Sequence, residues 1–283
     1  MVDRNEKPKK VVVTAVFDAV PETMVWTLYH RASEARRPDR VLSDETAVEL
    51  VDRIGFPFAE RFGPAHPLHS QAQALRARRF DVEVERFLAS HPDGTVVALG
   101  EGLETQFWRV DNRLVQWLSV DLDEPIAARR RLLPSCARQR TVVGSALDQR
   151  WMDEVDPGQG VLITAQGLLM YLQPPEAHQL ISRCARRFPA SSLVFDAVPL
   201  WLSARTMSGM SNAAGYQPPR CHGALTALSA RGWRSSPAWP GCTSSHFRAD
   251  ADHCSARSYR CSAATSRVRC GTSHPGRYSA SSS

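Results

Sequence analysis

The stretch of residues 95–121 (TVVALGEGLETQFWRVDNRLVQWLSVD) limits the possible folds more than any other part of the chain. A short apolar run, residues 96–99, ends abruptly at Gly100-Glu101-Gly102, and a second run, residues 115–120, stops at Asp121. The order strand, glycine turn, helix, strand and acid is typical of the first half of a nucleoside-binding α/β unit. Glycines let the backbone turn tightly beneath a ligand. The carboxylate of Asp121, 19 residues after Gly102, is placed to accept both hydroxyls of a ribose.

The residues of this turn favour a ligand that has no pyrophosphate. A dinucleotide-binding turn reads G-x-G-x-x-G and directs a helix N-terminus at the pyrophosphate. Here Thr105 stands at the third glycine position, and Glu101 and Glu104 flank the turn, so we expect the turn to repel the phosphates of NAD. S-adenosylmethionine fits better, because it carries a ribose and a sulfonium cation but no phosphate. A single G-x-G is a weak signal, since many such turns carry it for packing alone.

Length and composition favour one large α/β domain without a membrane segment. The chain has 283 residues, of which 43% are hydrophobic, enough for a sizeable core. No apolar stretch approaches the roughly 18 residues of a spanning helix. The apolar run at residues 11–20 is short and interrupted by Asp18, so we expect neither signal peptide nor anchor, and a cytoplasmic location. The seven cysteines form no C-x-x-C pair, and no metal is expected.

The positive charge of the chain belongs to its C-terminal part. Residues 220–283 hold nine Arg, no Lys and two acids, a net charge of +7. Since the whole chain carries +6, the remaining residues carry −1. The body therefore offers no electrostatic footprint for a phosphate backbone, and we expect no nucleic-acid partner.

Hydrophobic periodicity predicts strands that alternate with helices. Such alternation is typical of a parallel sheet with helices on both faces. Helices before residue 95 are expected to cap the carboxyl ends of the strands, where ligands bind in such sheets. A helix start is expected at residues 43–46, and a loop or lid at 56–67. Helices are expected at 22–36, 70–89, 124–133 and 174–187, and strands at 96–99, 115–120, 141–143, 161–165 and 192–197.

Five motifs in order resemble those of the leucine carboxyl methyltransferase family, most closely its bacterial polyketide-type O-methyltransferase branch. The resemblance covers roughly residues 14–219. It implies a class I methyltransferase fold, α/β and Rossmann-like with an N-terminal helical cap, that uses S-adenosylmethionine as methyl donor. The motifs are residues 27–32 (TLYHRA), 76–81 (RARRFD), 97–105 (VALGEGLET), 117–122 (WLSVDL) and 165–172 (AQGLLMYL).

The resemblance also implies roles for individual residues. Arg76 would bind the methionine carboxylate, Gly100 and Gly102 would lie under the donor, and Asp121 would take the ribose hydroxyls. Gln166 would lie beside the methionine amino group, where relatives often have Glu; the swap removes a charge but keeps an acceptor. The family's adenine contacts fall on Leu147 and on Asp148, which stands in for an acid that some relatives place at Ala146. The family also keeps a basic residue near His30 and Arg31, and the sequence does not say which of the two serves.

The methyl acceptor stays open at this stage. A carboxylate is already ionised at neutral pH and needs no base, so positioning and exclusion of water would suffice. A hydroxyl requires a general base close by. His30, His66 and His69, in the expected cap, are the candidates, and no sequence arrangement singles one out.

The last part of the chain, residues 220–283, departs from the family pattern. It holds 14 Ser and 5 Cys but no Ile, Glu or Met, and it has no apolar run long enough for a strand. We therefore expect a disordered tail, or the product of a shifted reading frame, and a fold without the family's C-terminal strands. The fifth strand would then have an uncovered edge. Cysteine and histidine spacings in the tail lack the short pairs of zinc sites.

These observations predict a division of the chain and three candidate functions. Residues 1–219 are expected to form the methyltransferase domain, with a cap at 14–90 and a Rossmann-like core at 94–219. The first function is O-methyl transfer to a carboxylate or hydroxyl of a small molecule of secondary, polyketide-type metabolism. The second is a catalytically impaired remnant that binds the donor weakly or not at all, and the third is an NAD-dependent oxidoreductase. The partner is a small-molecule acceptor, with no membrane partner, and the oligomeric state is undetermined.

Overall fold

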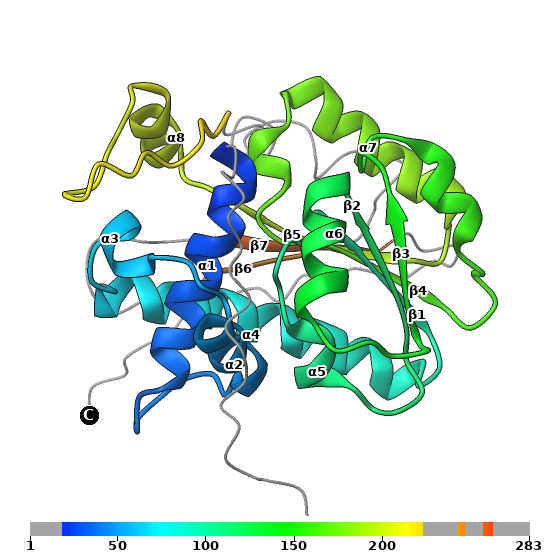
Figure 1. Cartoon of the computed structure of the whole chain (residues 1–283). Coiled ribbons are helices and arrows are strands. Elements are labelled where there is room, and N and C mark those ends of the chain that lie inside the picture. Colours follow the sequence, from blue (N-terminus) through cyan, green and yellow to red (C-terminus); the bar gives the residue numbers. More distant parts are fainter. Residues whose placement is uncertain (1–18, 223–242, 247–256, 263–283) are drawn as a thin grey trace, which may run out of the picture.

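Seven strands form one sheet in the order β3-β2-β1-β4-β5-β7-β6 (Figure 1). The structure is a computed structural model that describes residues 19–222, 243–246 and 257–262. The five parallel strands confirm the expected sheet: β1 (Thr95–Leu99), β2 (Gln116–Asp121), β3 (Gln139–Val143), β4 (Val161–Ala165) and β5 (Ser192–Ala197).

The middle of the sheet lies where the strand order reverses. β1 pairs with β2 on one side, with Thr95 opposite Gln116, and with β4 on the other, with Thr95 opposite Val161. Both β1 and β4 are buried along their whole length, as expected for central strands of a parallel sheet. In open α/β sheets, ligands bind at the carboxyl ends of the strands beside such a reversal. The fold therefore places a site at the ends of β1, β2 and β4.

Two strands from the C-terminal part complete the sheet. β7 (Arg257–Ser262) pairs antiparallel with β5, from Ser192 opposite Ser262 to Ala197 opposite Arg257, and β6 (Thr243–His246) pairs with β7. The expectation that these strands are missing, and that β5 has an uncovered edge, is therefore wrong. Strand pairing uses backbone N–H and C=O groups, which every residue except proline offers, so a Ser- and Arg-rich composition does not prevent it.

The expected helices are present, with two additions: one in a segment predicted as a loop and one directly after β5. The segment predicted as a loop or lid contains α3 (Phe58–Phe62), whose two terminal rings are buried. Burial of two rings one turn apart stabilises a helix that Pro and Gly signals do not predict. In the described part, no helix has the length and apolarity to cross a membrane. The remaining helices are α1 (Ala19–Ala35), α2 (Glu45–Arg53), α4 (Pro67–Ser90), α5 (Gln106–Val110), α6 (Asp123–Leu132), α7 (Pro174–Arg187) and α8 (Leu200–Met207), with the 3-10 helices η1 (Gln149–Glu154) and η2 (Leu169–Tyr171).

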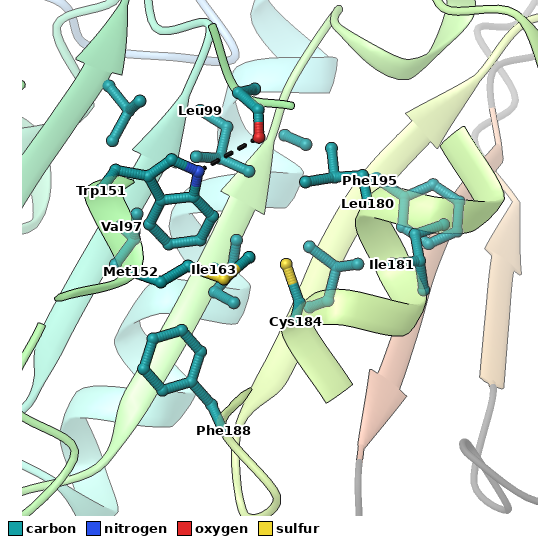
Figure 2. Packing of buried hydrophobic residues seen from close by; sticks show 14 of the residues in the cluster. Val97, Leu99, Trp151, Met152, Ile163, Leu180, Ile181, Cys184, Phe188 and Phe195 are labelled. Atoms are coloured by element: carbon teal, nitrogen blue, oxygen red, sulfur yellow. Dashed lines mark hydrogen bonds between the residues drawn. The ribbon is translucent and has the colours of Figure 1, made fainter. Parts of the chain in front are cut away.

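Alternate residues of the strands build a core on each face of the sheet. Val97 and Leu99 of β1 face the layer that contains α7 and η1, whereas Val96 and Ala98 face α4 and α5. Figure 2 shows the first of these clusters, in which Trp151 packs between strands and helix and donates from Nε1 to the Ala146 carbonyl at 3.1 Å. A buried indole N–H without a partner would cost stability, so this bond permits the ring to lie in the core.

Helices α1 to α3 share one hydrophobic cluster and α4 packs against α1, which gives the expected cap to one side of the sheet in Figure 1. α2 begins at Asp44, whose side chain accepts from the Ala47 amide. α1 lies directly over the glycine turn: a Cβ added at Gly102 would stand 2.9 Å from Met24 Cβ. The second half of α4, with Phe80 and Val84, packs against the sheet instead. α4 therefore links the cap to the core.

Candidate functional site

The structure brings most of the expected site residues to one edge of the sheet. Gly100 and Gly102 follow β1, Asp121 ends β2, and Gln166 follows β4. Carboxyl ends of neighbouring parallel strands lie at the same edge, which places these residues side by side. Arg76 reaches this edge from α4, since a Cβ added at Gly167 would lie 3.5 Å from its Nη1 atom.

The glycine turn and Asp121 form one hydrogen-bonded unit. Gly100 and Gly102 have φ angles of +63° and +53°, a conformation that favours glycine. Asp121 Oδ2 accepts from the Gly102 amide and Oδ1 from the Leu122 amide, both at 2.8 Å. Burial raises the pKa of Asp121, and these two amides act against that rise. Each carboxylate oxygen has a further acceptor site, so the side chain can still bind a hydroxyl pair.

Two buried polar atoms near Gly167 lack partners among the described residues. One is the Nε donor of Arg76 and the other is the Oε1 acceptor of Gln166. An α-amino acid group presents a carboxylate and an ammonium, which need one donor and one acceptor of this kind. The amino-acid part of S-adenosylmethionine therefore fits the residues present.

Sequence reasoning missed Asp196, which supports this pair from β5. Asp196 Oδ1 accepts from the Gly167 amide at 2.7 Å, and Oδ2 lies 3.5 Å from Arg76 Nη1. Burial raises the pKa of Asp196, and the Arg76 guanidinium acts against that rise. The available signal was an acid inside the apolar strand SLVFDA, since a buried carboxylate requires partners.

The two expected adenine contacts, Leu147 and Asp148, differ in what their side chains contact. Leu147 is half-buried and packs against the hydrophobic core, while its carbonyl accepts from Arg183. Asp148 instead caps η1 by accepting from the Arg150 amide at 3.0 Å, and it pairs with the Arg150 guanidinium at 2.7 Å. Its carboxylate is therefore engaged by the neighbouring turn.

Glu101 and Glu104 are paired with buried arginines and do not face the ligand. The expectation that these two carboxylates repel a pyrophosphate is therefore wrong. Glu101 is buried against Arg129 at 3.0 Å and accepts from the Trp117 indole at 3.1 Å. Glu104 lies at the N-terminus of α5, where its Oε1 atom accepts from the Thr105 amide at 2.9 Å. In dinucleotide-binding turns the pyrophosphate binds to free backbone amides at a helix N-terminus. Here the Glu104 carboxylate already accepts from the Thr105 amide, so this amide is not available to a phosphate and a dinucleotide is still disfavoured.

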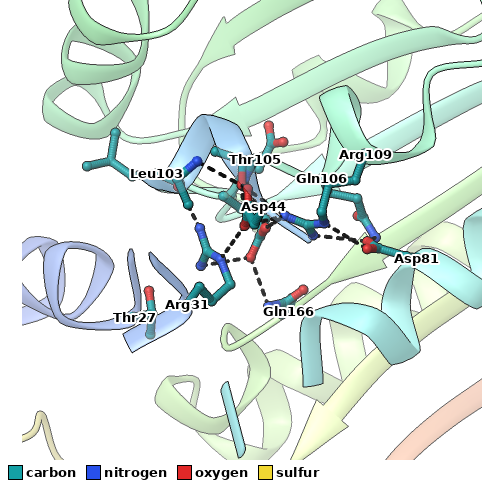
Figure 3. A network of polar contacts seen from close by, with 12 residues as sticks. Thr27, Arg31, Asp44, Asp81, Leu103, Thr105, Gln106, Arg109 and Gln166 are labelled. Atoms are coloured by element: carbon teal, nitrogen blue, oxygen red, sulfur yellow. Dashed lines mark hydrogen bonds and ion pairs between the residues drawn. The ribbon is translucent and has the colours of Figure 1, made fainter. Parts of the chain in front are cut away.

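A buried ionic network joins the cap to the glycine turn (Figure 3). Arg31 from α1 pairs with Asp44 at 3.2 Å and with Glu104 at 3.0 Å. Arg109 from α5 pairs with the same two acids and with Asp81 of α4. Of the two basic candidates in the cap, Arg31 is therefore the one tied to the site.

The three candidate bases gather in the cap. The ring of His69 lies 5.9 Å from that of His30 and 5.1 Å from that of His66, measured between centroids. His30 is buried and its Nδ1 atom hydrogen-bonds to Ser70 Oγ at 3.0 Å. Burial first, and then His69 and His66, lower the pKa of His30 from 6.5 to about 3. His30 is therefore neutral near pH 7, whereas His69 is exposed.

Buried His30 makes the stability of the fold depend on pH. Because its pKa is lower in the folded than in the unfolded state, the unfolded state binds more protons between pH 6.5 and 3, and stability falls as pH drops through this window. We expect this residue to lower the free energy of unfolding by roughly 2 kcal/mol between pH 7 and pH 5. The measurement is urea unfolding at both pH values for the wild type and His30→Gln. A pH effect of equal size in both would contradict the prediction, and His178→Gln, on the exposed side of α7, is the control.

The chain is similar in sequence to known methyltransferases. A sequence model of leucine carboxyl methyltransferases matches residues 24–185. The chain is 35% identical over 183 residues to the tetracenomycin polyketide synthesis O-methyltransferase TcmP of Streptomyces glaucescens. This match covers 64% of this chain and 67% of that protein. It is 28% identical over 188 residues to the S-adenosyl-L-methionine-dependent methyltransferase dpfgK of Gibberella zeae, with 61% and 62% covered, so it spans less than two thirds of that relative. An O-methyltransferase family protein from Burkholderia thailandensis superposes with a TM-score of 0.43 at 14% identity, over 88% of this chain and 73% of that one.

Proposed function

Because the chain belongs to the leucine carboxyl methyltransferase family and is an S-adenosylmethionine-dependent methyltransferase, we propose that it methylates an oxygen atom of a small aromatic acceptor. The acceptor oxygen is a carboxylate or a phenolic hydroxyl of a polyketide-type molecule. The observation that carries this proposal is the 35% identity to a polyketide O-methyltransferase.

The donor site in this proposal uses the residues at the carboxyl edge of the sheet. When bound, the donor would supply the methyl group of its sulfonium centre, which passes to the acceptor oxygen as the methyl–sulfur bond breaks and neutral S-adenosylhomocysteine leaves. Asp121 holds the ribose hydroxyls and Gly100 and Gly102 allow close approach of the backbone. Arg76 holds the carboxylate of the methionine part, and Gln166 holds its ammonium. Leu147 offers an apolar surface for adenine; Asp148 is left out, because Arg150 engages its carboxylate.

The acceptor site in this proposal lies under the cap, beside aromatic rings. Trp26 of α1 is nearly parallel to Tyr216, with an interplanar angle of 16° and a centroid distance of 6.3 Å. Among the described residues the buried Tyr216 hydroxyl has no hydrogen-bond partner, so it is available to donate to an acceptor oxygen. Flat aromatic molecules pack well against such rings. For a hydroxyl acceptor, His69 is the exposed ring next to Trp26, at 6.3 Å, and the group we assign as general base.

Methyl transfer from donor labelled on the methyl group tests the proposed chemistry. The purified chain is incubated with aromatic polyketide acids and with phenols of matched ring size, and the products are treated with mild alkali. We expect labelled product that is an alkali-labile ester for a carboxylate acceptor or an alkali-stable ether for a phenol. Label on nitrogen or carbon, or no transfer to any oxygen acceptor while the donor binds, would contradict the proposal.

A further inference from the structure

The side chain of Gln166 is oriented by Glu104. Gln166 Nε2 donates to Glu104 Oε2 at 3.1 Å, whereas Gln166 Oε1 is buried with no partner in the described part of the chain. A carboxylate only accepts hydrogen bonds, so it must face the NH₂ end of the amide. The oxygen end of Gln166 therefore points away from Glu104.

Glu104 is itself held firmly in the ionised state. Its Oε2 atom lies 3.0 Å from Arg31 Nη1, and its Oε1 atom lies 2.9 Å from Arg109 Nη1. Burial alone would raise the pKa of Glu104, but the guanidinium groups of Arg31 and Arg109 lower it to about 2. Glu104 is thus a fixed acceptor between the cap and the sheet.

The groups around Gln166 Oε1 indicate which kind of ligand this oxygen would bind. Gln166 precedes Gly167, whose position lies against the Arg76 guanidinium. Arg76 Nε is the second buried atom without a partner at this place, and it is a donor. An acceptor beside a guanidinium donor matches the ammonium and carboxylate of a zwitterionic α-amino acid group.

We propose that Glu104 is a positioning residue, which fixes the Gln166 amide so that Oε1 receives the ammonium of the donor's methionine part. The proposal rests on the donor site described under the proposed function. It goes further in assigning selectivity for the amino group to Glu104, a residue that does not touch the donor. Because Glu104 fixes the amide, the neutral Gln166 side chain presents an acceptor oxygen in a defined direction, and no second carboxylate is needed beside Glu104.

The substitution Glu104→Gln should reverse the Gln166 amide. The Thr105 amide and Arg109 Nη1 both face the Oε1 position, so the oxygen of the newly introduced side chain takes that position. Its NH₂ group then takes the Oε2 position, where it faces the NH₂ group of Gln166. Gln166 would then turn over and present a donor to the ammonium. Adding Gln166→Glu restores a carboxylate that accepts from residue 104 with one oxygen and faces the ammonium with the other.

Calorimetric titration with two nucleosides tests the proposal. S-adenosylhomocysteine carries the amino-acid group, and 5′-methylthioadenosine lacks it. We expect Glu104→Gln to weaken S-adenosylhomocysteine about tenfold, the loss of one charge-assisted hydrogen bond, and to leave 5′-methylthioadenosine within about twofold. In a Gln166→Met background, the same change should have no further effect on either nucleoside, because the acceptor is already gone.

Three outcomes would overturn the proposal. One is equal weakening of both nucleosides by Glu104→Gln, and another is a full tenfold effect in the Gln166→Met background. The third concerns the double variant Glu104→Gln/Gln166→Glu, which keeps the number of buried charges and is measured in any case, so that the test stands if Glu104→Gln alone does not fold. Weaker binding of S-adenosylhomocysteine, but not of 5′-methylthioadenosine, by this double variant would overturn the proposal. If the wild type binds neither nucleoside, the donor site itself is wrong, which is a distinct result.

Discussion

Replacing Arg109 by leucine is expected to lower the free energy of unfolding by about 3 to 5 kcal/mol. The Arg109 guanidinium binds Asp81 through two nitrogens, at 2.7 and 3.0 Å, and it lies 2.8 Å from Asp44 and 2.9 Å from Glu104. Leucine would leave three buried carboxylates with Arg31 as their remaining cation in this network. An uncompensated buried charge costs far more than an ion pair contributes at the surface. Since a domain is typically stable by about 5 to 15 kcal/mol, this change approaches unfolding.

Arg36→Leu is the matched control for this measurement. Arg36 pairs with Asp52 at 2.7 Å, as close as the contacts of Arg109, but both side chains are exposed, at 39% and 67%. We expect a loss below about 1 kcal/mol, because water screens the pair and hydrates either partner alone. Urea unfolding of both variants is the measurement. Losses of similar size in the two would contradict a structural role for the buried network.

The variant Asp121→Ala is expected to weaken S-adenosylmethionine by at least about tenfold, and by about a hundredfold if both ribose hydroxyls depend on it. Alanine removes the carboxylate from the ribose and also from the Gly102 amide, which it now holds at 2.8 Å. The glycine turn then loses one of its hydrogen bonds to β2 and keeps the one from the Gly100 amide to the Val120 carbonyl. Calorimetric titration of the folded variant measures the loss.

Asp123→Ala is the control for that titration. Asp123 is an exposed acid two residues further on, in the first turn of α6. We expect its affinity for the donor to stay within about twofold of the wild type, because its charge is solvated and lies outside the site. Equal affinities for Asp121→Ala and the wild type would refute the assignment of Asp121 to the ribose.

The glycine turn, Asp121 and the helix over residues 70–89 could be predicted because their signals are local. An apolar run that stops at glycines specifies a strand and a turn within a few residues. The stripe of Phe80, Val84 and Phe87 specifies which face of α4 is buried, and the structure places it on the sheet. The edge that carries the site follows from the order of such elements.

The ionic network could not be predicted, because its members are distant in sequence. Asp44 and Arg109 are 65 residues apart, and Gln166 and Glu104 are 62 apart. Nothing in the local pattern of Glu101 or Glu104 distinguishes a carboxylate that faces a ligand from one paired with a buried arginine. The repulsion argument against a dinucleotide failed at this point, although the amide that a phosphate would need at Thr105 is indeed occupied.

The added strands had no sequence signal of the usual kind. β7 lies in a Ser- and Arg-rich segment without an apolar run, yet it pairs with all six residues of β5. Strand prediction from sequence relies on side chains that suit a buried surface, whereas the backbone groups that pair two strands are the same in almost every residue.

Direct titration of the unmodified chain with S-adenosylmethionine, and separately with NAD, is the most direct test of a phosphate-free nucleoside site. One molecule of S-adenosylmethionine should bind per chain. At a concentration 100 times its Kd it should raise the free energy of unfolding by about 2.7 kcal/mol in a cooperative melt. NAD should give neither heat of binding nor stabilisation. Absence of binding by S-adenosylmethionine, or saturable binding of NAD at the same site, would contradict the account.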